Sequence, residues 1–210
     1  MPSERSRVRV VVFSGGRGSS ELVKGLVRHP AVTLTLAING YDDGLSTGEV
    51  RRFLGDSLGP SDFRKNASRV ARELGTAPSA LIALTEARLP VGCTGVDAQR
   101  LFDHVAGRST AAIDAPDRSW ADRAAEVDEV TRQRLGHLLD TFQAELAASG
   151  RPFDFSDCSL GNIVFAGVYL ESGRRFNDAV DAYCALLGLE PGLVDNVTDG
   201  TNAHLVALTR

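Results

Sequence analysis

The sequence predicts an α/β fold: a Rossmann-like parallel sheet with flanking helices and an inserted helical lobe. Two apolar runs of strand length, at residues 8–13 and 32–38, flank one amphipathic helix through short connections. That pattern is typical of a β-α-β unit. The first run is almost entirely valine, as expected of a strand in a buried parallel sheet. A polar, glycine-containing loop follows each run, and open α/β sheets bind ligands at that edge.

The helix between the two strands is expected to begin at Ser19 or Ser20 and to end before Pro30, because proline cannot continue a helix. Apolar periodicity and the positions of glycine and proline predict the later elements. Further helices are expected just after Ser46 or Thr47 and over residues 61–74, 79–89, 163–170 and 175–187. Late strands are expected at residues 193–194 and 205–208.

A long and irregular helical stretch interrupts the α/β pattern. It follows a break at residues 90–95 and ends at the loop-forming residues 149–152. We therefore expect an α/β core over residues 1–96 and 151–210, with a helical lobe over residues 97–150.

Composition restricts the class of protein. Of 210 residues, 43% are hydrophobic and 24% charged, which is typical of a globular domain with a buried core. The net charge of −4 gives no overall attraction to nucleic acid or anionic lipid, so neither is expected as a partner. No apolar run has membrane-spanning length, and no signal peptide is recognisable. Three cysteines without CxxC spacing favour reduced thiols, and we expect a cytoplasmic protein.

The loop after the first strand reads Ser-Gly-Gly-Arg-Gly-Ser-Ser over residues 14–20. Backbone N–H groups at a helix N-terminus bind anions, and Gly15, Gly16 and Gly18 would let a phosphate approach the backbone. The loop is not a P-loop, because no Gly-Lys-Ser/Thr follows. Glu21 occupies the place of the third glycine of a dinucleotide fingerprint. A tight turn that binds nothing remains the alternative.

The loop after the second strand carries two adjacent carboxylates, Asp42 and Asp43. Such a pair is stabilised by solvent, by a metal ion such as Mg²⁺, or by donors such as ribose hydroxyls. Asp43 is accordingly a candidate Mg²⁺ ligand, and Ser46 adds a hydroxyl nearby. The alternative is a solvated Asp-Asp-Gly turn.

Two further polar segments open later helices. Asp62, Arg64, Lys65 and Asn66 lie at the first, and its two cations could neutralise a diphosphate. The alternative, and the commoner case for such a run, is a capped helix with surface cations. The second segment, Ser-Leu-Gly-Asn at residues 159–162, would suit base or sugar contacts, with an ordinary helix cap as the alternative.

These four segments, in this order, resemble the family of 2-phospho-L-lactate transferase and the gluconeogenesis factor (CofD-like and YvcK-like proteins). The family pattern has Gly-Gly-Thr-Gly, then Asp-Asp-Gly-Gly-Ser-x-Gly-x-x-Arg, then Pro-x-Gly-Asp-x-Arg, and later Gly-Asn at a helix start. The counterparts here are Gly-Gly-Arg-Gly at residues 15–18, Asp-Asp-Gly-Leu-Ser-Thr-Gly-Glu-Val-Arg at 42–51, Gly-Pro-Ser-Asp-Phe-Arg at 59–64, and Gly-Asn at 161–162.

The resemblance implies a Rossmann-like fold with a nucleotide-derived ligand in its cleft. In the transferase branch, a phosphate-linked group passes from a GDP-linked donor to a deazaflavin alcohol with Mg²⁺. In the gluconeogenesis-factor branch, a nucleotide sugar such as a UDP-sugar is bound in a regulatory role. The sequence leaves both open. It also leaves open a small NAD(P)-dependent reductase, although no Tyr-x-x-x-Lys pair supports one.

By this resemblance Asp42 and Asp43 are the catalytic candidates. The candidate ligand-binding residues are Gly15, Gly16, Arg17, Gly18, Ser46, Arg51, Asp62, Arg64 and Asn162. Three positions depart from the pattern, because Arg17 replaces threonine and Leu45 and Ser61 replace glycine. Family members usually continue into further strands and a second glycine-rich loop, so either a completing segment or a reduced site is expected. A homo-oligomer is one open alternative for the assembly.

Overall fold

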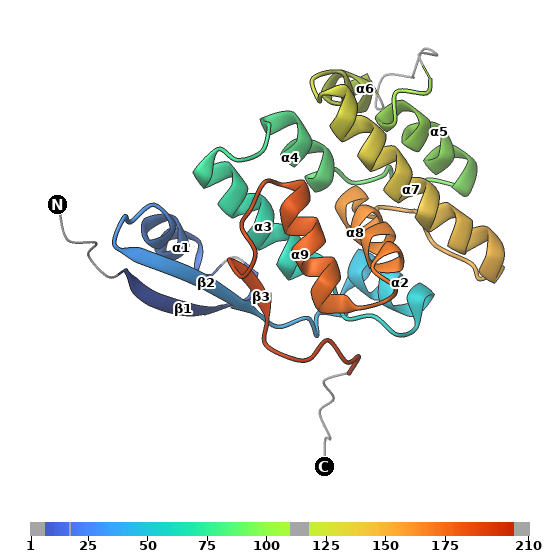
Figure 1. Ribbon diagram of the computed structural model, residues 1–210. Coiled ribbons are helices and arrows are strands. Elements are labelled where there is room, and N and C mark those ends of the chain that lie inside the picture. Colours follow the sequence, from blue (N-terminus) through green and yellow to red (C-terminus); the bar gives the residue numbers. More distant parts are fainter. Residues whose placement is uncertain (1–6, 17, 110–117, 204–210) are drawn as a thin grey trace.

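The computed structural model describes residues 7–16, 18–109 and 118–203. Its parallel sheet has the order β1-β2-β3, formed by β1 (Val8–Ser14), β2 (Val32–Ile38) and β3 (Val194–Asn196). The chain therefore has the predicted α/β class, a Rossmann-like parallel sheet with flanking helices (Figure 1).

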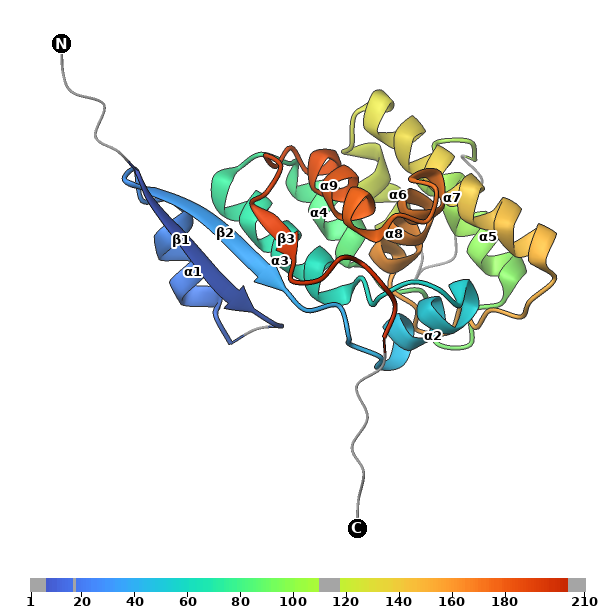
Figure 2. The same cartoon turned by 60° about the horizontal axis from the view of Figure 1, so that its bottom comes forward.

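Nine helices are formed by the described residues: α1 (Ser20–Val27), α2 (Leu45–Leu54), α3 (Ser61–Leu74), α4 (Ser79–Glu86), α5 (Gly95–Val105), α6 (Arg118–Ala125), α7 (Glu129–Ser149), α8 (Leu160–Glu171) and α9 (Phe176–Leu186). The sheet lies at one end of the molecule, and α5, α6 and α7 lie at the other (Figures 1 and 2). None of these helices is both long enough and apolar enough to cross a lipid bilayer.

The sheet is packed on one face. Alternate residues of β2, namely Leu34, Leu36 and Ile38, are buried, and α1 and α3 contact this strand. The opposite face of β1 carries Val11 and Phe13, which are 57% and 80% exposed. Parallel sheets are normally covered on both faces. In the described part of this chain, one face of the sheet is uncovered.

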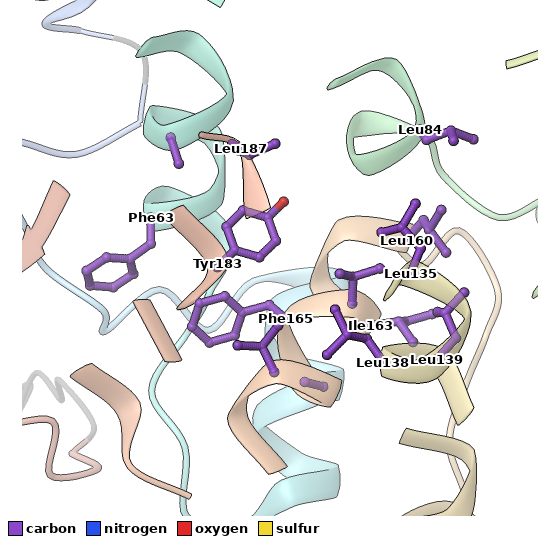
Figure 3. Packing of buried hydrophobic residues seen from close by; sticks show 14 of the residues in the cluster. Phe63, Leu84, Leu135, Leu138, Leu139, Leu160, Ile163, Phe165, Tyr183 and Leu187 are labelled. Atoms are coloured by element: carbon purple, nitrogen blue, oxygen red, sulfur yellow. The ribbon is translucent and has the colours of Figure 1, made fainter. Parts of the chain in front are cut away.

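The main hydrophobic core surrounds α8, which is buried from its first residue to Tyr169. Figure 3 shows Ile163 of α8 grouped with Leu138 and Leu139 of α7, while Phe165 lies beside Tyr183 of α9. The rings of Phe165 and Tyr183 are 5.6 Å apart between centroids. One continuous cluster thus joins the predicted lobe to the rest of the chain.

The predicted lobe, residues 97–150, contains most of α5 and all of α6 and α7. Helix α5 begins with a capping box, in which Thr94 and Asp97 bond each other's backbone N–H groups. The lobe packs against α4 and α8. The three cysteines of the chain are buried and form no disulfide.

Several predicted boundaries need correction. The helix predicted over 79–89 ends at Glu86, because Ala87 is extended and Arg88 forms a β-bridge with Ser159. The helix predicted just after Ser46 or Thr47 begins at Leu45 instead. The late strand predicted at 193–194 is β3, and the one predicted at 205–208 lies outside the described residues.

Candidate functional site

Three polar segments meet where β1 and β2 end. They are the glycine turn (residues 14–19), the acidic loop (residues 41–44) and the start of α3. The carboxylate of Asp62 lies 4.0 and 3.7 Å from the positions that a Cβ would take on Gly15 and Gly16. Asp62 is also close enough to the carboxylate of Asp42 for that charge to affect its pKa.

Side chains of α3 donate hydrogen bonds to backbone carbonyl groups of the glycine turn. Asn66 Nδ2 donates to the carbonyl of Gly15 at 2.9 Å, and Arg69 Nη2 donates to that of Gly16 at 2.8 Å. Asn66 is fully buried, and its Oδ1 accepts from Ser14 Oγ at 3.2 Å. The turn is therefore anchored from the side of α3.

The protein fold does not require the glycines of this turn. A Cβ on Gly18 would meet nothing within 4 Å, and one on Gly15 or Gly16 would make only ordinary contact with Asp62. Neither Gly15 nor Gly16 has a positive φ. Because glycine loses more conformational freedom on folding than other residues, three glycines here have a cost that packing does not explain. Arg17, between them, lies outside the described residues.

The acidic loop is shaped by Arg51, whose side chain is 2% exposed. Its Nη1 donates to the carbonyls of Tyr41 and Asp42 at 3.3 and 3.1 Å and lies 3.6 Å from Asp43 Oδ1. Its Nη2 donates to the carbonyl of Ala203 at 2.7 Å. Arg51, a predicted ligand residue, thus binds the loop itself, and it leaves the Asp43 side chain 55% exposed.

Close packing demands glycine around this loop. A Cβ on Gly48 would lie 2.5 Å from the carbonyl oxygen of Asp43, and one on Gly59 would lie 2.4 Å from that of Asp42. Leu45, the first residue of α2, has a φ of 43°, in the left-handed region that favours glycine. The glycine pattern of this loop therefore serves the fold, and Leu45 is strained within it.

The pKa of Asp62 is raised, first because the carboxyl is partly buried and then because Asp42 lies nearby. Lys65 Nζ, 3.8 Å from Asp62 Oδ1, acts in the opposite direction. Carboxyl groups with a raised pKa are frequent at functional sites, which makes Asp62 a candidate.

Three other predicted ligand residues, Ser46, Arg64 and Asn162, form a buried network. Asn162 Nδ2 donates to Ser46 Oγ at 2.9 Å, and Arg64 Nε donates to Asn162 Oδ1 at 2.9 Å. The network ties α2, α3 and α8 together. Burial lowers the pKa of the Arg64 guanidinium, because its charged form has lost solvent.

The sequence prediction placed Asn66 in the polar segment at the start of this helix but gave it no ligand role, and it did not include Arg69. With Asp62 they recur at i, i+4 and i+7, which places them on one face of α3. The helical spacing from Asp62, a predicted site residue, is the sequence signal that places Asn66 and Arg69 beside it.

The acidic loop borders a cavity of about 550 Å³, lined by Asp43, Leu45, Gly48, Arg51, Arg52, Gly55 and Asn202. Among the described residues, no group of three or more His, Cys, Asp and Glu side chains is placed to hold a metal ion. Mg²⁺ is commonly bound by one or two carboxylates together with phosphates of the substrate. The exposed carboxylate of Asp43 fits that arrangement and does not fit an all-protein metal cage.

Comparison with known proteins gives one informative likeness. The crystal structure of protein BH3568 from Bacillus halodurans is similar, with a TM-score of 0.52 and 22% sequence identity. The match covers 92% of this chain and 40% of that chain, so this chain corresponds to less than half of that protein. No protein-family model and no curated protein matches. At this identity the likeness supports the fold alone.

Proposed function

We propose that this chain binds a nucleotide-derived diphosphate at the carboxyl ends of β1 and β2, as the resemblance to 2-phospho-L-lactate transferase implies. The observation that carries the proposal is the glycine turn, whose glycines the fold does not require. A phosphate resting on the backbone N–H groups at the start of α1 would explain all three, because any side chain there would keep it away.

The aspartates complete the proposed site. Asp43, exposed at the end of the second strand, would accept the hydroxyl of an alcohol substrate or bind Mg²⁺. Asp62 would approach the phosphate from α3, beside the glycine turn, where partial burial raises its pKa. Bound Mg²⁺ would neutralise phosphate charge and make the β-phosphorus easier to attack. The chain's own contribution to such a transfer is to position the phosphate and the alcohol.

A second candidate is a nucleotide-sugar-binding regulatory protein without catalysis. One observation favours this candidate: the guanidinium groups of Arg51 and Arg64 both donate hydrogen bonds to oxygens of the protein itself. Fewer cations are then left to stabilise the charge that develops during phosphoryl transfer.

The test is thermal unfolding in the presence of GDP, a UDP-sugar or a deazaflavin, with and without Mg²⁺. A ligand at 100 times its Kd stabilises by about 2.7 kcal/mol, which raises the Tm of a chain of this size by roughly 5–10 °C. We expect a shift with at least one nucleotide diphosphate, and turnover in addition if the chain is a transferase.

The matched variants are Gly18→Val in the turn and Gly25→Val in the middle of α1. A Cβ at either position meets nothing within 4 Å. We expect Gly18→Val to abolish the ligand-induced shift and Gly25→Val to retain it. A nucleotide-induced shift that survives in Gly18→Val would show that the phosphate does not bind at the turn.

A further inference from the structure

A second cavity, of about 520 Å³, opens beside α3, next to the end of α4 and the start of α1. Five of its lining residues are cations: Arg64, Lys65, Arg69, Arg72 and Arg88. Neither the glycines of the turn nor the aspartates of the acidic loop line it. Its volume lies within the range of about 300–1,000 Å³ that is typical of small-molecule sites.

Helical spacing places three of these cations on one face of α3. Lys65, Arg69 and Arg72 recur at i, i+4 and i+7, and so share one face of α3. Arg88 reaches the same cavity from the segment after α4, where it pairs with Asp157 at 2.6 Å. Arg64 contributes from the buried side of the cavity wall, with 4% of its surface exposed.

The carboxylates around the cavity do not balance its cations. Glu86 pairs with Arg72 at 2.8 Å, Asp62 lies 3.8 Å from Lys65, and Asp157 pairs with Arg88. These three carboxylates face five cations, so positive charge is in excess.

Arg64 and Arg69 account for the excess positive charge, because neither forms an ion pair with a carboxylate among the described residues. Arg64 donates to two neutral oxygens, Asn162 Oδ1 at 2.9 Å and the carbonyl of Thr85 at 3.0 Å. Arg69 donates to the carbonyl of Gly16 and to Asn66 Oδ1. A buried guanidinium without a counter-charge is unfavourable, and an anion in the cavity would supply the charge that the protein does not.

We propose that this cavity is a binding site for a small molecule bearing two or more phosphate groups. Guanidinium groups bind phosphate oxygens in pairs, so arginines around one cavity favour clustered phosphates over a single carboxylate. A concave site favours a small polyphosphorylated ligand over a nucleic acid, which would need an extended basic surface. The cavity adjoins the proposed phosphate site, because Ser20 at the start of α1 lines it. The glycines of the turn and the aspartates of the acidic loop do not line it, so each site has its own variants.

The test is isothermal titration of the full chain with inorganic tripolyphosphate at moderate salt. The double variant Lys65→Glu/Arg72→Glu reverses two exposed charges at the rim and leaves buried Arg64 intact. The control is Arg100→Glu/Arg175→Glu. Both control residues are exposed, each pairs with an acid three residues away, and neither lines the cavity. We expect at least a tenfold weaker Kd in the first variant and less than a twofold change in the control.

Three results would overturn the proposal. They are no binding of tripolyphosphate at millimolar concentration, equal weakening in both variants, and tighter binding of a single-stranded RNA oligonucleotide that depends on the same residues. Titration with GDP distinguishes two classes of ligand. If the natural ligand is a nucleotide, GDP should have a lower Kd than inorganic diphosphate; if it is a free polyphosphate, it should not. Gly18→Val should bind tripolyphosphate like the wild type, which keeps this site distinct from the glycine turn.

Discussion

The glycine turn and the acidic loop look alike in sequence but differ in what their glycines do. Each follows a strand of the same parallel sheet and combines glycine with polar residues. Around the acidic loop, Gly48 and Gly59 leave no room for a Cβ, whereas Gly18 in the turn has open space beside it. A glycine-rich loop can therefore reflect tight packing of the chain or approach of something outside it, and only coordinates separate the two causes.

The largest expected effect comes from Gly59→Ala. Its Cβ would lie 2.4 Å from the Asp42 carbonyl oxygen and 2.7 Å from a methyl carbon of Thr47, and the backbone would have to move. We expect the free energy of unfolding to fall by about 3 kcal/mol. Urea denaturation measures the change. A loss below about 1 kcal/mol would mean that the loop is loosely packed.

Arg51→Gln and Arg52→Gln form the next comparison, since the two residues are adjacent in α2. Arg51 is buried and donates to loop carbonyls, while the Arg52 side chain is 53% exposed and pairs with Glu49. We expect Arg51→Gln to lower the free energy of unfolding by about 2 kcal/mol, because the buried carbonyls of the loop lose their donors. Arg52→Gln should change it by less than about 0.5 kcal/mol. Equal thermal unfolding of the two variants would contradict the anchoring role of Arg51.

Leu45→Gly should stabilise the acidic loop. Leu45 is 85% exposed with a φ of 43°, so the substitution removes backbone strain without removing packing. Relief of about 1–3 kcal/mol of strain exceeds the roughly 0.5–1 kcal/mol that glycine costs in the unfolded state. We expect a modest rise in Tm for glycine and none for Leu45→Ala, which retains the strained geometry. A fall in Tm for the glycine variant would argue against strain.

Asp62→Asn tests the carboxyl between the two regions through pH. Because the pKa of Asp62 is raised in the folded state, the native protein binds the proton more tightly than the unfolded chain does. The contribution of Asp62 to stability should therefore fall as pH rises from about 4 through its native pKa, so stability should increase more steeply with pH, or decrease less, in Asp62→Asn than in the wild type. Chemical denaturation at a series of pH values measures both slopes. Parallel pH profiles for the wild type and the variant would show that Asp62 is not perturbed.

The smallest expected effect on stability is that of Gly18→Ala, which should change the free energy of unfolding by less than about 0.5 kcal/mol. Gly25→Ala, also in open space but inside α1, should stabilise by about 0.5–1 kcal/mol, because alanine favours the helix. Thermal melts without ligand measure both. A marked loss in Gly18→Ala would place the turn with the acidic loop, as a segment whose glycines serve packing.

The sequence predicted the first β-α-β unit well because its signals are local. The apolar run of β2 and the end of α1 before Pro30 depend on neighbouring residues only. The roles of polar residues depend on distant contacts. Ser46 and Asn162, predicted to touch a ligand, bond each other across more than a hundred residues of chain. The bond from Asn66 to the Gly15 carbonyl was not predicted, because the two residues lie 51 positions apart in the sequence.

The exposed edge of the sheet has a consequence for association between molecules. Strand β1 ends the sheet, so its outer main-chain donors and acceptors have no neighbouring strand among the described residues. Arg9 is the only charged side chain on β1, and charges on edge strands are what normally discourage strand-to-strand association between molecules. Within β1, Arg9 is therefore the side chain that opposes pairing of this edge with the edge strand of a second molecule.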